Sequence, residues 1–208
     1  MKIPKDMQKD ILLESFEVLK TNYEKNYLNI SDTIGKMAVI DIDTAMDMIE
    51  HIFVSNPSLV VYDTRSGLIF TNPYCPLTSN IIECISNYRE LSAIADAIAS
   101  RPKIIEVLFG KSGHISRCEC LIIAEYISRG EIEIANEILQ LISANKNNTG
   151  VGGSLTLSGI LQAIIDKLGS DASENAVDFV HYWIQQIQDS NDKAKANVKF
   201  LDFFIKKE

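Results

Sequence analysis

The 208-residue chain lacks the features that mark membrane-spanning, secreted and nucleic-acid-binding proteins. No apolar run approaches the ~20 residues that a membrane-spanning helix requires. No segment has the excess of lysine and arginine that is typical of a nucleic-acid-binding surface. Residues 1–6 lead into a charged stretch, without the apolar core of a signal peptide. We therefore expect a cytoplasmic protein that binds neither a membrane nor a nucleic acid.

Cysteine is scarce, and the four thiols are those of Cys75, Cys84, Cys118 and Cys120. In a cytoplasmic chain we expect them to be reduced, with two or three of them buried. His114 adds a further metal-ligating side chain, but Cys118 and Cys120 point roughly 200° apart on a helix. Because a zinc site needs about four converging ligands, buried thiols are the better interpretation.

Catalytic and cofactor-binding motifs are absent as well. Gly110-Lys111-Ser112 matches only the end of a phosphate-binding loop, because Ile105 stands where that motif requires a glycine. We therefore expect no cofactor, and a binding protein rather than an enzyme.

What the chain does contain is typical of an ordered protein with an acidic surface. Hydrophobic residues make up 46% and charged residues 23% of the sequence, which argues against disorder. The formal net charge is −8, and no part of the chain is basic. The acidity favours solubility and can steer a basic protein partner.

Apolar residues recur at helical spacing along most of the chain. The first predicted helix covers residues 5–28, and Asp43 is the expected N-cap of a helix over 44–54. Glycine follows several of the apolar stretches, as it does at helix ends. The other predicted helices cover residues 31–39, 78–88, 90–100, 102–110, 115–129, 131–144, 155–168, 173–189 and 192–206.

Residues 59–72 interrupt the helical pattern. The stretches 59–62 and 68–71 are β-branched and aromatic, and the turn-forming residues 63–67 lie between them. This pattern predicts one small β-hairpin packed on the helices, and the alternative is a helix pair with a glycine turn.

A short mark recurs about every forty residues and closes an apolar, helix-like run each time. Its three copies are Glu83-Cys84-Ile85-Ser86, Glu125-Tyr126-Ile127-Ser128 and Asp166-Lys167-Leu168-Gly169, spaced by 42 and 41 residues. In period and pattern, residues 78–189 resemble the armadillo and HEAT class of helical repeats. The resemblance implies stacked antiparallel helix pairs that bind a protein without a cofactor.

We expect a single helical domain over residues 1–208. Residues 145–153 are polar and glycine-rich, which predicts a flexible insertion. It separates a larger N-terminal part, 1–144, from a C-terminal three-helix part, 154–208. Because the recurring mark continues across it, we interpret it as an insertion within one stack.

One predicted helix face gathers Asp43, Asp47, Glu50 and His51. The pattern favours a solvated acidic surface. One alternative is a docking face for a basic partner, formed by Asp43, Asp47 and Glu50. The other alternative is a small enzyme or metal-binding protein that uses this face. Carboxylates and an imidazole can bind divalent metals or transfer protons. The metal ligands would be Asp43, Asp47 and His51.

Aromatic residues gather in the last two predicted helices. They are Phe179, Tyr182, Trp183, Phe200, Phe203 and Phe204. Core packing accounts for most of them, with Trp183 inside. The last unit of a stack has only one neighbour, so an apolar outer side would let two chains form a homodimer through the C-terminal helices.

The sequence therefore favours a non-catalytic protein–protein interaction module. A small acidic inhibitor, such as an immunity protein that blocks a basic toxin, matches the size, the charge and the lack of catalytic motifs. The identity of the partner is not encoded in any motif.

Overall fold

A computed structural model describes residues 3–55, 75–111, 115, 117–144, 156–169 and 172–205. Within these ranges all regular structure is helical and no strand occurs, so the prediction of a mostly α-helical chain is confirmed. The predicted hairpin at 59–72 and the predicted insertion at 145–153 lie outside the described residues. In the described part of the chain, no helix is both long and apolar enough to cross a membrane.

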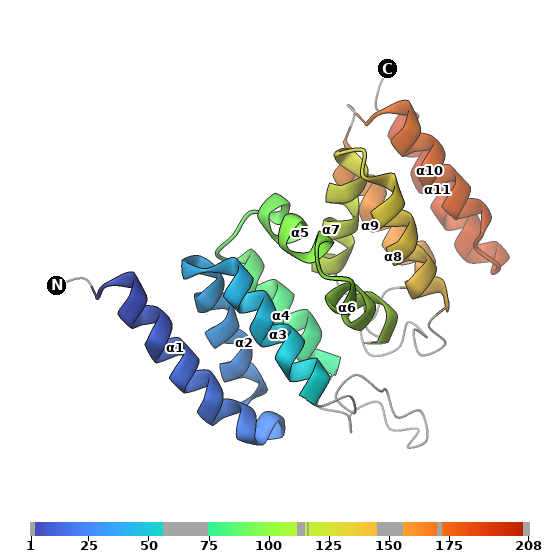
Figure 1. The fold of residues 1–208 in the computed structure, drawn as a ribbon. Helices are drawn as coiled ribbons and strands as arrows, with labels where there is room; N and C mark the ends of the chain where they lie inside the picture. The colour runs from blue at the N-terminus through green and yellow to red at the C-terminus, as the bar shows by residue number, and fades with distance from the viewer. Residues whose placement is uncertain are drawn as a thin grey trace.

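Within each described range, the helices follow one another with short connections (Figure 1). Their bounds are α1 Lys5–Leu19, α2 Tyr23–Ile40, α3 Ile42–Ser55, α4 Cys75–Ser86, α5 Leu91–Ala99, α6 Pro102–Ile105, α7 Arg117–Ser128, α8 Ile132–Ala144, α9 Leu157–Leu168, α10 Glu174–Gln185 and α11 Ser190–Ile205. A 3₁₀ turn, Lys20–Asn22, joins α1 to α2, and a π-helical segment, Glu106–Lys111, continues α6.

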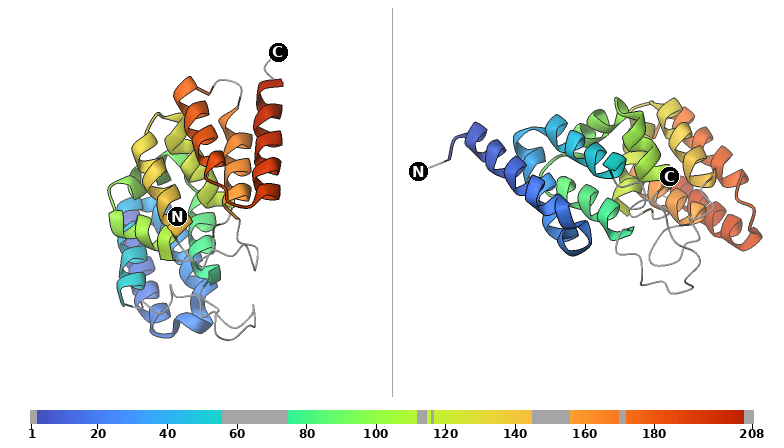
Figure 2. Two further views of the ribbon diagram at one scale, coloured as in Figure 1. Left: turned by 90° about the vertical axis from the view of Figure 1, so that its right-hand side faces the viewer. Right: turned by 60° about the horizontal axis from the view of Figure 1, so that its bottom comes forward.

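The helices lie in two layers. Layer B consists of α2, α4, α7, α9 and α11, and each of these helices contacts the next. Layer A consists of α1, α3, α5, α6, α8 and α10. Figure 1 shows α3 in front of α4 and α8 in front of α9. Along the array α1 and α11 lie at opposite ends, as the right view of Figure 2 also shows.

The core lies between the two layers and is rich in isoleucine. In α9, for example, Ile160, Leu161, Ile164 and Ile165 are buried at helical spacing, as an amphipathic helix requires. The same arrangement of buried apolar residues runs from Phe16 in α1 to Ala196 in α11. The core is therefore continuous along the described array.

The N-terminal helices differ from the prediction of one helix over 5–28 and a second over 31–39. The chain turns at Lys20–Asn22, and α2 then runs unbroken to Ile40. The Asn22 side chain caps α2 by accepting from the backbone N of Lys25, and Asn26 Nδ2 donates to the Leu19 carbonyl at 3.1 Å. These two side chains satisfy backbone groups that a helix break leaves open.

Gly35 lies inside α2, where its low helix propensity weakens the helix. A Cβ atom at this position would lie 3.0–3.1 Å from Cβ and the backbone C and O of Cys84 in α4. The glycine therefore permits a close approach of α2 and α4 that a side chain would obstruct.

Arginine side chains join successive helices of the array. Arg89, after α4, donates from Nε to the Ala38 carbonyl at 2.5 Å and from Nη2 to the Val39 carbonyl at 3.1 Å, at the end of α2. Arg129, after α7, donates to Asp96 of α5 at 2.5 Å. In the same junction, the Tyr126 hydroxyl donates to the Ala95 carbonyl at 2.6 Å. The Arg89 contacts satisfy carbonyls at the end of α2, and all of these contacts fix how adjacent helices meet.

Candidate functional site

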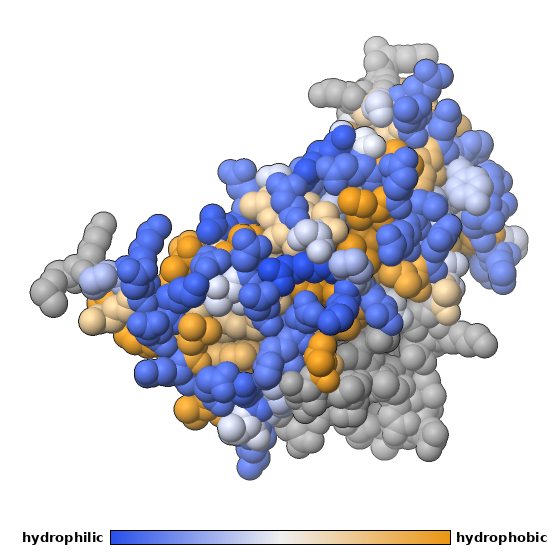
Figure 3. Space-filling model, viewed as in Figure 1, coloured by the Kyte–Doolittle hydropathy of each residue, from blue (hydrophilic) through white to orange (hydrophobic). Residues whose placement is uncertain are grey.

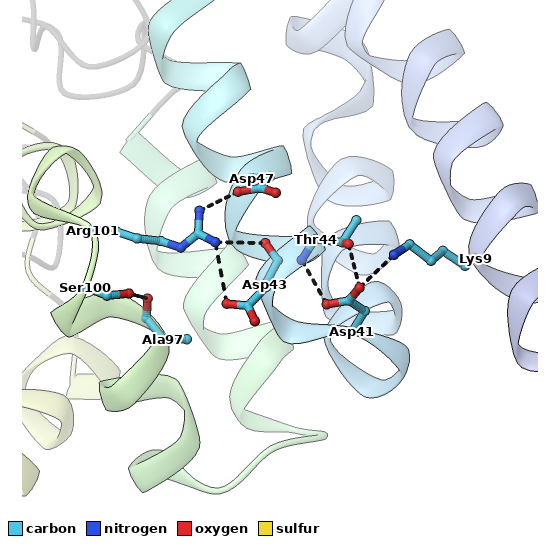
Figure 4. A network of polar contacts seen from close by, with 8 residues as sticks. All are labelled: Lys9, Asp41, Asp43, Thr44, Asp47, Ala97, Ser100 and Arg101. Carbon is cyan, nitrogen blue, oxygen red and sulfur yellow. Dashed lines mark hydrogen bonds and ion pairs between the residues drawn. The ribbon is translucent and has the colours of Figure 1, made fainter.

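The acidic face predicted on α3 begins with a different capping residue from the one expected. Asp41, not Asp43, is the N-cap: its Oδ1 accepts from the Thr44 backbone N at 3.1 Å and its Oδ2 from Thr44 Oγ1 at 2.7 Å. Lys9 Nζ of α1 also donates to Asp41 Oδ2 at 2.7 Å (Figure 4). The hydrogen bond from Lys9, followed by those from Thr44, lowers the pKa of Asp41 well below its usual range. The helix begins at Ile42, two residues earlier than the predicted start at residue 44.

Asp43 and Asp47 lie together, and Arg101 connects them (Figure 4). Arg101 immediately precedes α6. One guanidinium nitrogen donates to Asp47 Oδ1, and the other lies 3.5 Å from Asp43 Oδ1 and 3.4 Å from the Asp43 carbonyl oxygen. The Arg101 side chain is 18% exposed, whereas those of Asp43 and Asp47 are 75% and 69% exposed. The guanidinium therefore lies below the two carboxylates and partly neutralises them.

Glu50 is neutralised in the same way. Its Oε1 lies 3.0 Å from Nζ of Lys103, in the first turn of α6. Glu50, Ser100, Arg101, Pro102 and Lys103 line a shallow surface depression between α3 and α6. All three carboxylates of the predicted docking face are thus paired with cations from a neighbouring element.

His51 makes its contacts on the other side of α3, toward α1. Lys20 Nζ donates to His51 Nε2 at 3.0 Å, and the imidazole meets the edge of the Phe16 ring with centroids 6.3 Å apart. The proposed metal ligands Asp43, Asp47 and His51 are therefore engaged by Arg101 on one side and Lys20 on the other. Across the described ranges, no three His, Cys, Asp or Glu side chains are placed to hold a metal ion.

The acidic positions of α3 recur in two other helices of layer A. All three helices carry the sequence acid-x-Ala-x-acid followed by two apolar residues: Asp43–Ile49 in α3, Glu133–Leu139 in α8 and Glu174–Val180 in α10. The alanine and the apolar pair are buried in each helix, and both acids are exposed. The pattern can be found in the sequence alone. Only the structure shows that the three helices lie in the same layer.

Unlike the acids of α3, those of α8 and α10 have no cationic partner among the described residues. Neither helix contains a lysine or an arginine. Glu133 and Glu137 of α8, and Glu174 and Asp178 of α10, are exposed and form no ion pair with any described residue. We call these four carboxylates the α8–α10 acidic face.

α8 and α10 are neighbours in layer A. Trp183 of α10 donates from Nε1 to Oδ1 of Asn136 in α8 at 3.3 Å, so the two helices meet directly. Asn136 lies between the two glutamates of α8 in the sequence. Figure 3 shows the side of the molecule that includes α3, α6 and α8, and hydrophilic residues cover most of it, with apolar patches between them.

Three of the cysteines, Cys84, Cys118 and Cys120, contribute free thiols to the helical core. Cys120 is fully buried, and Cys84 and Cys118 are half-buried. Burial raises the pKa of all three thiols, most strongly that of Cys120. His114 and the side chain of Cys75, the other members of the considered zinc set, lie outside what the structure describes.

The C-terminal aromatic residues divide between core and surface. Phe179 and Trp183 are buried and Phe200 packs partly against the core, so the prediction for Trp183 is confirmed. Tyr182 and Phe204 are exposed.

No family model matches the chain, and neither a curated protein nor a solved structure matches it.

Proposed function

We propose that the chain is a non-catalytic protein-binding module of the cytoplasm that docks a basic protein partner on the outer surface of layer A. The α8–α10 acidic face carries most of the binding, and Asp43, Asp47 and Glu50 of α3 extend it along the array. Within this class, an inhibitor that covers a basic protein, as an immunity protein does, is the best match.

The observation that carries the proposal is that the four acids of α8 and α10 have no ion-pair partner among the residues that the structure describes. Glu133 and Glu137 stand four residues apart, as do Glu174 and Asp178. Like charges at this spacing destabilise a helix by ~0.2–0.5 kcal/mol per pair. The first acid of each pair is favourable near a helix N-terminus, but the second lies beyond the first turn and gains little from the helix dipole. These acids therefore cost folding stability, which is expected of residues that serve binding.

The arrangement of the helices supports a binding role. The three recurring marks of the sequence lie at the ends of α4, α7 and α9, which succeed one another in layer B. In the first two marks the serine donates to the carbonyl three residues earlier, Ser86 to Glu83 at 2.7 Å and Ser128 to Glu125 at 2.9 Å. We infer a helical repeat of armadillo or HEAT type, a class that presents an extended surface to its partners.

The chemistry of the face indicates how it would act. Exposed carboxylates attract lysine and arginine side chains over about a Debye length, which is ~8 Å at physiological ionic strength. Rim charges of this kind mainly accelerate association and favour partners of opposite charge. A basic surface that spans α8 and α10 would meet four carboxylates without having to displace an existing ion pair.

Affinity capture from an extract of the source cells tests the proposal with two matched variants. The face variant carries Glu133→Gln, Glu137→Gln, Glu174→Gln and Asp178→Asn. The control variant carries Asp6→Asn, Asp10→Asn, Glu14→Gln and Glu17→Gln in α1, at the other end of the array. Both variants lose four exposed carboxylates, so the change in net charge is equal.

We expect the wild type and the α1 control to retain the same basic protein in stoichiometric amount at low salt, and the face variant to lose it. Circular dichroism and thermal unfolding verify that both variants remain folded. Equal retention by all three proteins, or loss of the basic protein from the α1 control as well, would contradict the proposal.

A further inference from the structure

The last helix, α11, is apolar on two opposite sides. Ala196 is buried and Phe200 packs against the core, which defines the inner side. The outer side carries an apolar stripe at i, i+4, i+7 and i+11, and its last three side chains are 60%, 59% and 69% exposed. The residues of this α11 stripe are Ala194, Val198, Leu201 and Ile205. A surface helix normally has one apolar side, so the second side is available for another surface.

The stripe lies at the end of the array. Among the described elements, α11 packs on α9 and α10. The left view of Figure 2 shows α11 at this end of the molecule, beside α9 and α10. Each earlier helix of layer B is in contact with the next helix of the layer, whereas no described helix of the layer follows α11.

We propose that a second copy of this chain covers the α11 stripe, and that the two α11 helices pack antiparallel about a two-fold axis. The spacing of the stripe is that of a coiled-coil seam, in which apolar residues alternate at three and four positions. An antiparallel pair centred between Val198 and Leu201 sets Val198 of each chain beside Leu201 of the other. The same register sets Ala194 beside the partner subunit's Ile205, so large and small side chains alternate along the seam.

Charge complementarity favours the antiparallel arrangement. Lys195 and Asp202 are seven residues apart and lie on the same flank of the stripe. Lys195 pairs with Asp192 of its own helix at 3.1 Å. In the antiparallel register, Lys195 of each chain also lies beside Asp202 of the other, which adds two ion pairs related by symmetry. A parallel pair would instead bring Asp202 near Asn197, with no opposite charge to meet it. The proposal is independent of the acidic face and of the partner that the face binds.

Sedimentation velocity of the full chain over a concentration series tests the proposal. We expect the wild type to reach the mass of two chains as the concentration rises. Leu201→Asp should raise the dissociation constant of the dimer more than about tenfold, because the seam would bury an unpaired charge. Val54→Asp, at an equally exposed valine of α3, should leave the dimer unchanged. A wild type that stays monomeric, or a Leu201→Asp variant that still dimerises, overturns the proposal.

A charge swap tests the orientation of the two helices. Lys195→Asp and Asp202→Lys should each weaken the dimer, and the double variant should restore it, because each pair is then reversed. Circular dichroism confirms that α11 stays folded in each variant. Failure of the double variant to recover toward the wild-type dissociation constant would overturn the antiparallel arrangement.

Discussion

The indole of Trp183 donates a 3.3 Å hydrogen bond to the side-chain oxygen of Asn136, and this contact joins α10 to α8. Trp183 is otherwise buried in the core, at 4% exposure. The pair therefore holds together the two helices that carry the unpaired carboxylates. This contact therefore contributes to the stability of the fold and also holds α8 and α10 in the positions that form the proposed binding face.

Truncation of Trp183 should be among the most destabilising changes in the chain. Trp183→Ala should lower the free energy of unfolding by about 3–5 kcal/mol, the range for removing a large buried aromatic side chain. Asn136→Ala removes only the acceptor and should cost about 1 kcal/mol. Urea denaturation measures both, with Tyr182→Ala as the control at an exposed neighbour. A loss below about 1 kcal/mol for Trp183→Ala would be inconsistent with a core position.

Gly35→Ala should destabilise the chain although alanine is the better helix former. The new Cβ would lie 3.0–3.1 Å from the backbone C and O of Cys84, which cannot move independently of α4. Overpacking of this kind costs about 1–3 kcal/mol, more than the ~1 kcal/mol that alanine gains in helix propensity. Thermal and urea unfolding measure the change in stability. An increase in stability for Gly35→Ala would contradict the prediction and would mean that α2 and α4 can move apart to accommodate the new Cβ.

Asp41 should make stability dependent on pH at the acidic end. Its pKa is lowered in the folded chain by Lys9 and Thr44, so its contribution is complete above its unfolded pKa of about 3.9. That contribution is lost as pH falls through and below this value, because the unfolded chain then binds the proton more readily. Asp41→Ala should cost about 0.5–2 kcal/mol at neutral pH, the range for an N-cap.

The difference between the wild type and Asp41→Ala should shrink when urea melts are repeated from pH 5 down to pH 3. Asp43→Ala, at the position that the sequence marks as the cap, should cost less at neutral pH. A cost for Asp41→Ala that stays constant over this pH range would show that the charge of Asp41 does not contribute.

Cys120 should be unreactive while the protein is folded. Burial removes the thiol from reagents and raises its pKa, so almost no thiolate exists at neutral pH. In a variant with Cys75→Ser, Cys84→Ala and Cys118→Ala, a thiol-specific dye should react slowly in buffer and fast in denaturant. Rapid labelling of the folded variant would mean that α7 opens readily or that the thiol is exposed.

Much of the fold follows from local sequence signals. Most helix positions follow from apolar periodicity and capping residues, as Thr156 and Ser173 at the starts of α9 and α10 illustrate. The break after Leu19 was not predictable in this way, because Lys20-Thr21-Asn22 contains neither proline nor glycine. The role of Gly35 was not predictable either, because it depends on the contact with Cys84 of α4, almost fifty residues further along the chain.

The candidate site was harder to predict than the fold. The sequence marks Asp43, Asp47 and Glu50 as an acidic face, but Arg101 and Lys103 approach them only in three dimensions. Of the three copies of the acidic pattern, those in α8 and α10 form no ion pair with a described residue. Their pattern is visible in the sequence, although only the layered arrangement shows that the three copies face the same way.

The most direct measurement of the central claim is the association rate of the captured basic partner with the wild type and the variants. At low salt, the α8–α10 face variant should associate several-fold more slowly than the wild type, whereas the α1 control should match the wild type. A variant with Asp43→Asn, Asp47→Asn and Glu50→Gln should show a smaller effect, because Arg101 and Lys103 already neutralise these carboxylates. At ~0.5 M salt the rates should converge, since the Debye length is then only a few ångströms. If the face variant binds at the wild-type rate in low salt, the acidic face does not bind the partner.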